Sequence, residues 1–249
     1  MSISAEYCGR FGNCMFIYSY ARLLSKTNNL RMETKWIYPE IIRANESDTG
    51  EVRTDKYVLI KDMAVSQHGI AHHLEDYKNK KVRLEGYFQH TDYIYYDEPF
   101  IRSIWNPDPV EKRPPEEIVL HLRLGDYFSS GLRSVISPRW HEQVLGMAGW
   151  HPKRKKLYIV IEDGNDKFLR NYQKFNPVIV SQSAKEDFDF IRSFDTIISS
   201  NSSFSWWAAF LSNASTIYTF APWLRFPREE QLNLAHMKGA TPVPGSFCK

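Results

Sequence analysis

The sequence after residue 116 alternates between short apolar runs and amphipathic segments, and this alternation limits the possible folds more than any other feature. Strands are predicted at 118–123, 157–162, 177–181, 196–199 and 216–220. Helices are predicted between them, at 138–147, 165–173, 185–194 and 204–212. Strands that alternate with helices in this way form a parallel sheet covered by helices, with right-handed crossovers. We therefore expect an α/β fold in this region.

The first hundred residues predict a second, less regular α/β unit. Strands are expected at 2–7, 30–37, 57–60 and 82–89, and helices at about 14–25, at 68–81 after a loop, and at 92–105 with an interruption near Pro99. The first strand is joined to the first helix by a glycine turn, which is a βαβ start. This turn reads G-x-x-G, so the dinucleotide-binding fingerprint G-x-G-x-x-G is absent.

A proline-rich stretch separates these two regions. The segment 106–115 contains Pro107, Pro109, Pro114 and Pro115, and prolines at this density disfavour a helix or a central strand. A chain of 249 residues is long enough for two modest domains. We expect an N-terminal domain at 1–106, a linker at 107–116, a C-terminal domain at 117–225 and a tail at 226–249 that packs back.

Composition excludes several classes of protein. The net charge of +3 is too small to indicate a nucleic-acid binder, and the basic segment 151–156 is interpreted as a solvated loop. The three cysteines, Cys8, Cys14 and Cys248, favour a reducing compartment. The sequence shows no signal peptide and no apolar run near the ~20 residues that span a bilayer, so we expect a cytoplasmic protein.

No metal site is expected. The histidines at 68, 72 and 73 have no cysteine or paired carboxylate at ligand spacing, which favours a solvated helix face. The one Asp-x-Asp sequence, at Asp187 and Asp189, falls inside a predicted helix, where residues two apart point to different faces. It is interpreted as a solvated helix start.

The strand at 118–123 carries two polar residues within an apolar run. His121 and Arg123 are two apart, so both side chains lie on one face of the strand. A buried guanidinium is costly unless an anion pairs with it. That anion is either a bound ligand, since the carboxyl ends of parallel strands open on the ligand crevice, or an internal carboxylate such as Asp126.

Two predicted helix starts also suit an anion. The sequence Ser200-Asn-Ser-Ser203 precedes the helix at 204–212, and Arg10, Gly12 and Asn13 lie at the start of the first helix. Backbone N–H groups at a helix start favour phosphate. The alternatives are a simple N-cap by Asn201 or Ser202 with Trp206 and Trp207 in the core, and, at the first helix, a tight turn with an exposed Arg10.

Four motifs resemble those of the α-1,2-fucosyltransferase family, in the same order. They are Gly9-Arg-Phe-Gly-Asn-Cys-Met-Phe16, Gly86-Tyr-Phe-Gln89, His121-Leu-Arg-Leu-Gly-Asp-Tyr127 and Ser200-Asn-Ser-Ser-Phe-Ser-Trp-Trp-Ala-Ala209. The resemblance implies a GT-B fold, in which two Rossmann-like domains face a cleft. It also implies that the N-terminal domain lies on the acceptor side and that the C-terminal domain binds GDP-fucose.

The resemblance also implies roles for residues. Arg123 would hold the donor pyrophosphate and His121 the nucleotide, and either Asp163 or Glu162 would accept hydrogen bonds from guanine or ribose. Ser202, Ser203 and the N–H of Phe204 would meet the β-phosphate, and Arg10 and Asn13 would face the donor. The implied donor-binding set is Gly12, His121, Arg123, Glu162, Asp163, Asn201, Ser202, Ser203 and Phe204, and the implied catalytic set is Arg10, Asn13, Arg123 and Asp126.

Two positions depart from the family pattern. The second arginine that usually follows the first in the strand motif is Leu124 here, and the usual glutamine after Asn13 is Cys14. The side chain of Leu124 is expected to alternate away from Arg123 and to affect packing. Cys14 raises the question of acceptor or sugar specificity.

The expected reaction is an inverting displacement without a metal or cofactor, in which an acceptor glycan hydroxyl attacks fucose and GDP leaves. Asp126 is either the general base or the residue that orients Arg123. The alternatives are a transferase of the same fold that uses another GDP-sugar, such as GDP-mannose, and a degenerate glycan-binding domain.

Overall fold

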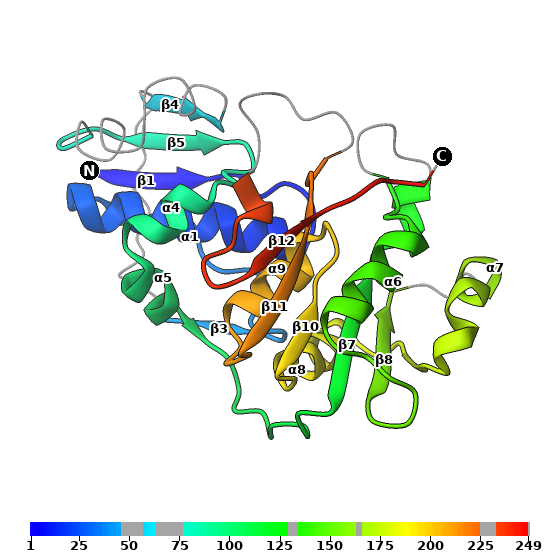
Figure 1. Cartoon of the computed structure of the whole chain (residues 1–249). Helices are drawn as coiled ribbons and strands as arrows, with labels where there is room; N and C mark the ends of the chain where they lie inside the picture. The colour runs from blue at the N-terminus through cyan, green and yellow to red at the C-terminus, as the bar shows by residue number, and fades with distance from the viewer. Residues whose placement is uncertain (46–56, 63–76, 129–133, 163–165, 225–232, 249) are drawn as a thin grey trace. The chain divides into compact units, whose positions relative to one another are not determined.

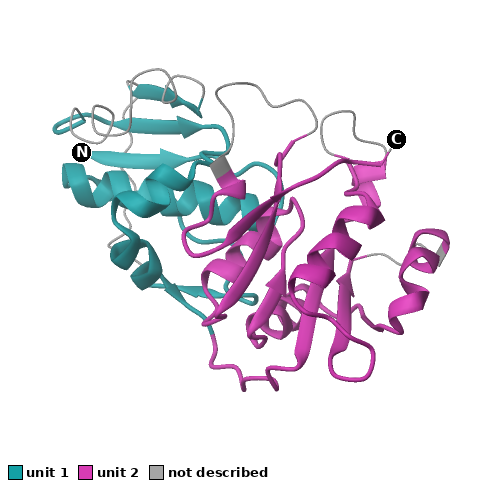
Figure 2. Cartoon of the chain, in the orientation of Figure 1, with its two compact units in different colours: residues 1–107, 228–233 teal, residues 108–227, 234–249 magenta. Residues whose placement is uncertain are grey.

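The computed structural model describes residues 1–45, 57–62, 77–128, 134–162, 166–224 and 233–248. The chain divides into two compact units, Met1–Pro107 with Arg228–Asn233, and Asp108–Pro227 with Leu234–Lys249 (Figure 2). Each unit contains a parallel sheet with helices. The predicted α/β class with two Rossmann-like units is therefore confirmed.

The sheet of the first unit has the strand order β2-β1-β5-β4 (Figure 1). Its strands are β1 (Ser2–Ala5), β2 (Arg31–Met32), β4 (Val58–Lys61) and β5 (Val82–Glu85). All neighbours are parallel, and Ile3 of the central strand β1 pairs with Met32 on one side and with Val82 on the other. The short strands β3 (Arg43–Ala44) and β6 (Trp105–Asn106) form a separate antiparallel pair. The strand predicted at 30–37 is much shorter than expected.

Helix α1 (Phe11–Asn28) packs against β1 and is buried over most of its length. It begins a turn earlier than predicted, because Arg10 already has the extended backbone of an N-cap. Asn29 ends it in the left-handed conformation, with φ of 52°. The early start places Phe11, Gly12 and Asn13 inside the helix.

The helix predicted at 92–105 forms as two short helices, α4 (Thr91–Tyr96) and α5 (Glu98–Ile104). The break lies at Asp97, whose side chain caps α5 by accepting a hydrogen bond from the Phe100 N–H at 3.2 Å. Pro99 lies in the first turn of α5, where its missing N–H leaves no helical hydrogen bond unmade. Pro99 therefore starts a helix rather than interrupting one. The helix predicted at 68–81 falls mostly outside the described residues.

The sheet of the second unit has the strand order β12-β11-β10-β7-β8-β9, and all its neighbours are parallel. Its strands are β7 (Glu117–Leu122), β8 (Lys156–Ile161), β9 (Val178–Val180), β10 (Thr196–Ile198), β11 (Thr216–Ala221) and β12 (Thr241–Pro244). The helices are α6 (Pro138–Met147), α7 (Asp166–Leu169), α8 (Ala184–Arg192) and α9 (Ser203–Phe210), with 3₁₀ turns η1 (Gly125–Phe128), η2 (Arg170–Phe175) and η3 (Asn233–Ala235).

Strand β7 contributes to the packing on both faces of this sheet. Ile118, Leu120 and Leu122 belong to one apolar core together with Trp140 and Val144 of α6. The residues between them point the other way, as alternation along a strand requires, and the His121 ring meets the ring of Phe204 in α9 at 5.7 Å. The covering of both faces explains why the predicted run is almost wholly apolar.

Two further predictions about packing are settled in this unit. Leu124 is 1% exposed and belongs to the same core as β7, so its expected role in packing is confirmed. Trp206 and Trp207 in α9 are fully buried, as the alternative with both residues in the core expected.

Strand β12 was not predicted, because Pro242 and Pro244 disfavour a strand. β12 tolerates these prolines because it is an edge strand.

Candidate functional site

Polar residues of the second unit gather at one edge of its sheet. Arg123 follows β7, Glu162 follows β8, and Ser199 to Ser202 follow β10. These three strands are neighbours and parallel, so their carboxyl ends lie at the same edge. This is the edge at which α/β sheets bind their ligands. The structure therefore brings together most of the residues that the motifs indicated for donor binding.

The Arg123 guanidinium is held by two carboxylates and an aromatic ring. It donates to Asp126 Oδ1 at 2.7 Å and to Glu162 Oε2, and it lies 5.2 Å from the centre of the Tyr127 ring. The Arg123 side chain is only 12% exposed, whereas those of Asp126 and Glu162 are 51% and 39% exposed. The internal pairing left open by the sequence is therefore present. Asp163, the competing acidic residue, lies outside the described residues.

His121 is buried beside the loop that follows β10. Its Nδ1 lies 2.8 Å from the Ser200 hydroxyl, and Ser199 and Ser200 both contact the Ser205 hydroxyl in the first turns of α9. Burial lowers the pKa of His121 to about 4, so the ring is neutral at pH 7. A neutral ring held in this way is a fixed hydrogen-bonding group at the strand edge.

Asn201 anchors the loop that leads into α9. Its side-chain amide donates to Ser134 O at 3.3 Å and to Trp223 O at 3.4 Å, and its backbone carbonyl accepts from the Tyr127 hydroxyl at 3.0 Å. The side chain of Ser202, the N-cap residue, makes no capping hydrogen bond. The interpretation of Asn201 or Ser202 as a side-chain N-cap is therefore wrong. Helix α9 begins at Ser203, and the positive end of its dipole lies at this edge of the sheet.

The first unit has a corresponding cluster at the carboxyl ends of its own strands. Gly9 has φ of +77°, and a Cβ at this position would lie 2.1 Å from Asn13 Nδ2. Asn13 is buried, and its Oδ1 accepts from Gln89 Nε2 at 2.6 Å. Arg10 is exposed, and Gly12 is buried in the first turn of α1. The motifs at 9–16 and 86–89 are thus joined by one hydrogen bond.

Asp62 is a residue of this cluster that the sequence did not indicate. Its Oδ2 accepts from the N–H groups of Tyr87 and Phe88, at 3.2 and 3.0 Å. Gly86, with φ of +136°, lies so close that a Cβ there would be 2.4 Å from the Asp62 Cβ. Asp62 therefore fixes the turn that delivers Gln89 to Asn13. Its only signal in the sequence was its place directly after a predicted strand.

The prediction for Asp187 was wrong. Asp187 is 6% exposed, accepts from the Gln182 N–H at 3.2 Å, and has its pKa raised by burial to about 6. Asp189 pairs with Lys185 at 2.8 Å and with Arg192 at 2.6 Å. Asp187 is thus buried and Asp189 is paired, rather than both being solvated, because α8 packs against α9. In the described part of the chain, no three His, Cys, Asp or Glu residues are grouped as metal ligands would be. The histidines at 68, 72 and 73 fall outside it.

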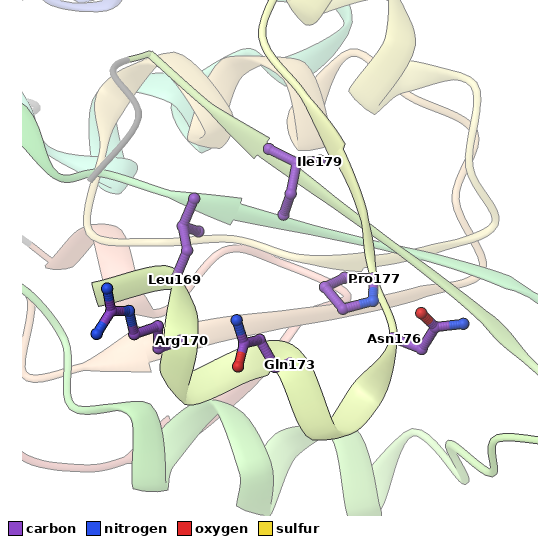
Figure 3. Close-up of a pocket in the computed structure, with 6 residues that line it drawn as sticks. All are labelled: Leu169, Arg170, Gln173, Asn176, Pro177 and Ile179. Carbon is purple, nitrogen blue, oxygen red and sulfur yellow. The ribbon is translucent and has the colours of Figure 1, made fainter. Parts of the chain in front are cut away.

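A pocket of about 500 Å³ lies elsewhere in the second unit (Figure 3). It is lined by Leu169, Arg170, Gln173, Asn176, Pro177 and Ile179. Pro177 precedes β9, so the pocket reaches the amino end of that edge strand. It is separate from the cluster around Arg123 and contains none of the residues that the motifs indicated.

Comparison with known families decides the assignment. The family model described as Glycosyl transferase family 11 matches residues 3–233. The chain belongs to this family. The match confirms the family resemblance drawn from the four motifs and makes the chain a glycosyltransferase of a fucosyltransferase family. No curated protein matches the sequence. No helix in the described ranges of this family 11 chain has the length and apolar character needed to cross a bilayer.

Proposed function

We propose that this chain transfers L-fucose from GDP-fucose to a hydroxyl of an acceptor glycan, forming an α-1,2 linkage with inversion. The observation that supports the proposal most strongly is the position of Arg123 at the carboxyl end of β7, the neighbour of the strand β10 that leads into α9, in a chain of family 11. A planar guanidinium suits a diphosphate, to which it binds through two parallel hydrogen bonds.

The proposed mechanism is a direct displacement. The acceptor hydroxyl attacks the anomeric carbon of fucose from the face opposite GDP, while the bond from that carbon to the β-phosphate oxygen breaks. The hydroxyl proton passes to a general base, for which Asp126 is the candidate. Negative charge develops on the departing diphosphate, and Arg123 with the N–H groups at the start of α9 stabilises it. These groups supply the charge stabilisation that a metal ion provides elsewhere, so we propose that the reaction is metal-independent.

Other residues have supporting roles in this proposal. His121, neutral and fixed by Ser200, contacts the nucleotide, and Glu162 or Asp163 accepts hydrogen bonds from guanine or ribose. Arg10, Gly12 and Asn13 of the first unit contribute to donor binding in this proposal, and the first unit carries the acceptor. A reducing, cytoplasmic location stays a prediction, and Cys8, Cys14 and Cys248 all carry free thiols.

The test is a thermal-shift measurement followed by turnover. GDP should stabilise the wild-type chain equally with and without a chelator, and Arg123→Ala should lose most of this stabilisation. GDP-fucose and GDP-mannose are then compared as donors by GDP release with a panel of acceptor glycans. If GDP is released faster from GDP-mannose than from GDP-fucose, mannose and not fucose is the donor sugar. If GDP is released from neither, the chain is a degenerate glycan-binding domain.

A further inference from the structure

The first unit contains an aromatic cluster that the mechanism leaves without a role. Tyr7, Phe11, Trp36 and Tyr38 contact one another with ring centres 5.6 to 6.2 Å apart. Phe11 is the first residue of α1, in the motif that contains Arg10 and Asn13. The cluster therefore stands at the start of α1, beside the candidate site residues of this unit.

Tyr38 is the member of this cluster whose ring suits a ligand. It is only partly buried, whereas Phe11 and Trp36 are 5% and 7% exposed. Tyr38 meets Phe11 at an interplanar angle of 88° and Trp36 at 60°, so neither contact stacks a ring flat on it. Among the described residues no ring is stacked parallel to that of Tyr38, and the ring is partly exposed. A partly exposed phenol ring can offer a surface to a sugar, whose C–H groups pack on aromatic faces.

The segment that carries Tyr38 is held in place by hydrogen bonds. The Trp36 indole donates to Ile42 O at 2.8 Å, and Tyr38 O accepts from the N–H groups of Ile41 and Ile42 at 3.1 and 3.2 Å. A ring fixed before binding loses little conformational entropy when a ligand arrives. The backbone at Tyr38 is thus held in place, and the ring itself is held by its contacts with Phe11 and Trp36.

The Tyr38 hydroxyl also contacts the position at which this chain departs from its family. It interacts with the thiol of Cys14, which stands where glutamine is usual and directly follows Asn13. Cys14 is 1% exposed, and burial is the main cause that raises its pKa to about 11, so the thiol stays protonated at pH 7. The small, uncharged thiol leaves the ring of Tyr38 to set the shape of the surface here.

We propose that Tyr38 is the stacking surface for the acceptor sugar and a determinant of acceptor specificity. This inference rests on the proposed function, because it assigns the acceptor to the unit that the family resemblance places on the acceptor side. The sugar ring lies on the face of Tyr38, beside Cys14. The occupant is a neutral pyranoside, since the cluster supplies aromatic faces and hydroxyls.

The test uses the full chain with lactose as the acceptor probe. Tyr38→Ala should raise the KM for lactose about tenfold, the scale of one lost aromatic contact. The KM for GDP-fucose and GDP-fucose hydrolysis without acceptor should stay unchanged. Tyr38→Phe, which keeps the ring, should stay within about threefold of the wild type. Tyr96→Ala is the matched control, because Tyr96 is an exposed tyrosine of the same unit, 46% exposed in α4.

Saturation-transfer NMR with lactose separates this proposal from the proposed function, because it requires no turnover. Lactose signals that disappear in Tyr38→Ala and persist in Tyr96→Ala support the stacking surface even if GDP-fucose is not the donor. A raised KM for GDP-fucose instead would assign the ring to the nucleotide and overturn the proposal. Equal losses in Tyr38→Phe and Tyr38→Ala, or no lactose signal in the wild type, would also overturn it. Tyr38→Leu replaces Tyr38→Ala if the smaller side chain prevents folding.

Discussion

Gln89 donates its side-chain amide to Asn13 Oδ1 at 2.6 Å, and the two residues are 76 positions apart in the chain. Each is 6% exposed. A buried hydrogen bond over this separation fixes the start of α1 relative to the turn after β5. The pair therefore gives a structural reason for two separate sequence motifs of the family.

Removing Gln89 should destabilise the first unit. Gln89→Ala takes away a buried donor from Asn13, and the expected loss is about 1–3 kcal/mol in the free energy of unfolding. Urea denaturation measures this loss, with Gln173→Ala as the control because Gln173 is an exposed glutamine. In a double-mutant cycle with Asn13→Ala, additive effects would show that the two side chains are not coupled.

Asp126 and Glu162 should behave alike if both orient Arg123. Asp126→Asn and Glu162→Gln each weaken one ion pair, so each should lower kcat/KM by a similar factor, about threefold to tenfold. In both variants, the fall of kcat/KM at low pH should remain, because neither residue is then the general base. If Asp126→Asn alone loses that fall and at least about a hundredfold in kcat, Asp126 is the general base.

Two buried histidines should make the protein less stable in acid. Burial lowers the pKa of His121 to about 4 and that of His141 to about 3, against 6.5 for the free side chain. Below pH 6.5 the unfolded chain therefore binds more protons than the folded chain, and stability falls as the pH drops from 6.5 to 4. The expected slope is about 1.4 kcal/mol per pH unit for each proton.

Denaturation at a series of pH values tests this slope. His141→Gln should reduce it, because His141 is 1% exposed and its Nδ1 lies 2.8 Å from the Tyr172 hydroxyl. His151→Gln is the control, since His151 is exposed. An unchanged slope in His141→Gln would contradict the lowered pKa.

Asp187 should act in the opposite direction. Burial raises its pKa from 3.8 to about 6, so between these values the folded chain binds more protons than the unfolded chain. The protonated Asp187 carboxyl therefore stabilises the folded chain at low pH. This stabilisation is lost as the pH rises through 6, where the buried carboxylate becomes charged. Asp187→Asn should therefore raise Tm at pH 8 and steepen the fall below pH 6. A lower Tm at pH 8 would show that the charged carboxylate is stabilising.

A side chain at Gly9 should disrupt the start of α1. Gly9→Ala places a methyl group 2.1 Å from Asn13 Nδ2 and forces alanine to φ of +77°, so we expect a loss of at least about 1–2 kcal/mol in stability together with reduced activity. Gly146→Ala is the matched control, because a Cβ there meets nothing within 4 Å. Equal Tm values for the two variants would contradict the proposed constraint.

The fold was predictable where both faces of a strand are covered. The apolar run around β7 and the boundaries of α6 follow directly from the sequence pattern, because helices cover that sheet on both sides. Strand β12 was not predictable in this way, since Pro242 and Pro244 are tolerated only because β12 is an edge strand. Local pattern does not show which strands will lie at an edge.

The candidate site was predictable from motifs but not from local chemistry. Arg123 and Asn13 were named because they stand in recognisable motifs, whereas Asp62 acts through a hydrogen bond to a turn that begins 25 residues later. Asp187 was wrongly predicted to be solvated for a related reason. The spacing of charges along a helix describes the helix alone, and the burial of Asp187 depends on the neighbouring helix α9.

In the proposed mechanism, the two carboxylates that hold Arg123 also affect how tightly the GDP product is retained. An arriving diphosphate must compete with Asp126 and Glu162 for the same N–H groups, so part of its binding energy is spent on breaking existing ion pairs. When GDP leaves, the carboxylates re-form those pairs and the guanidinium is never left bare. Rapid departure of the spent nucleotide is thus favoured by the same residues that keep the arginine in position for the next donor.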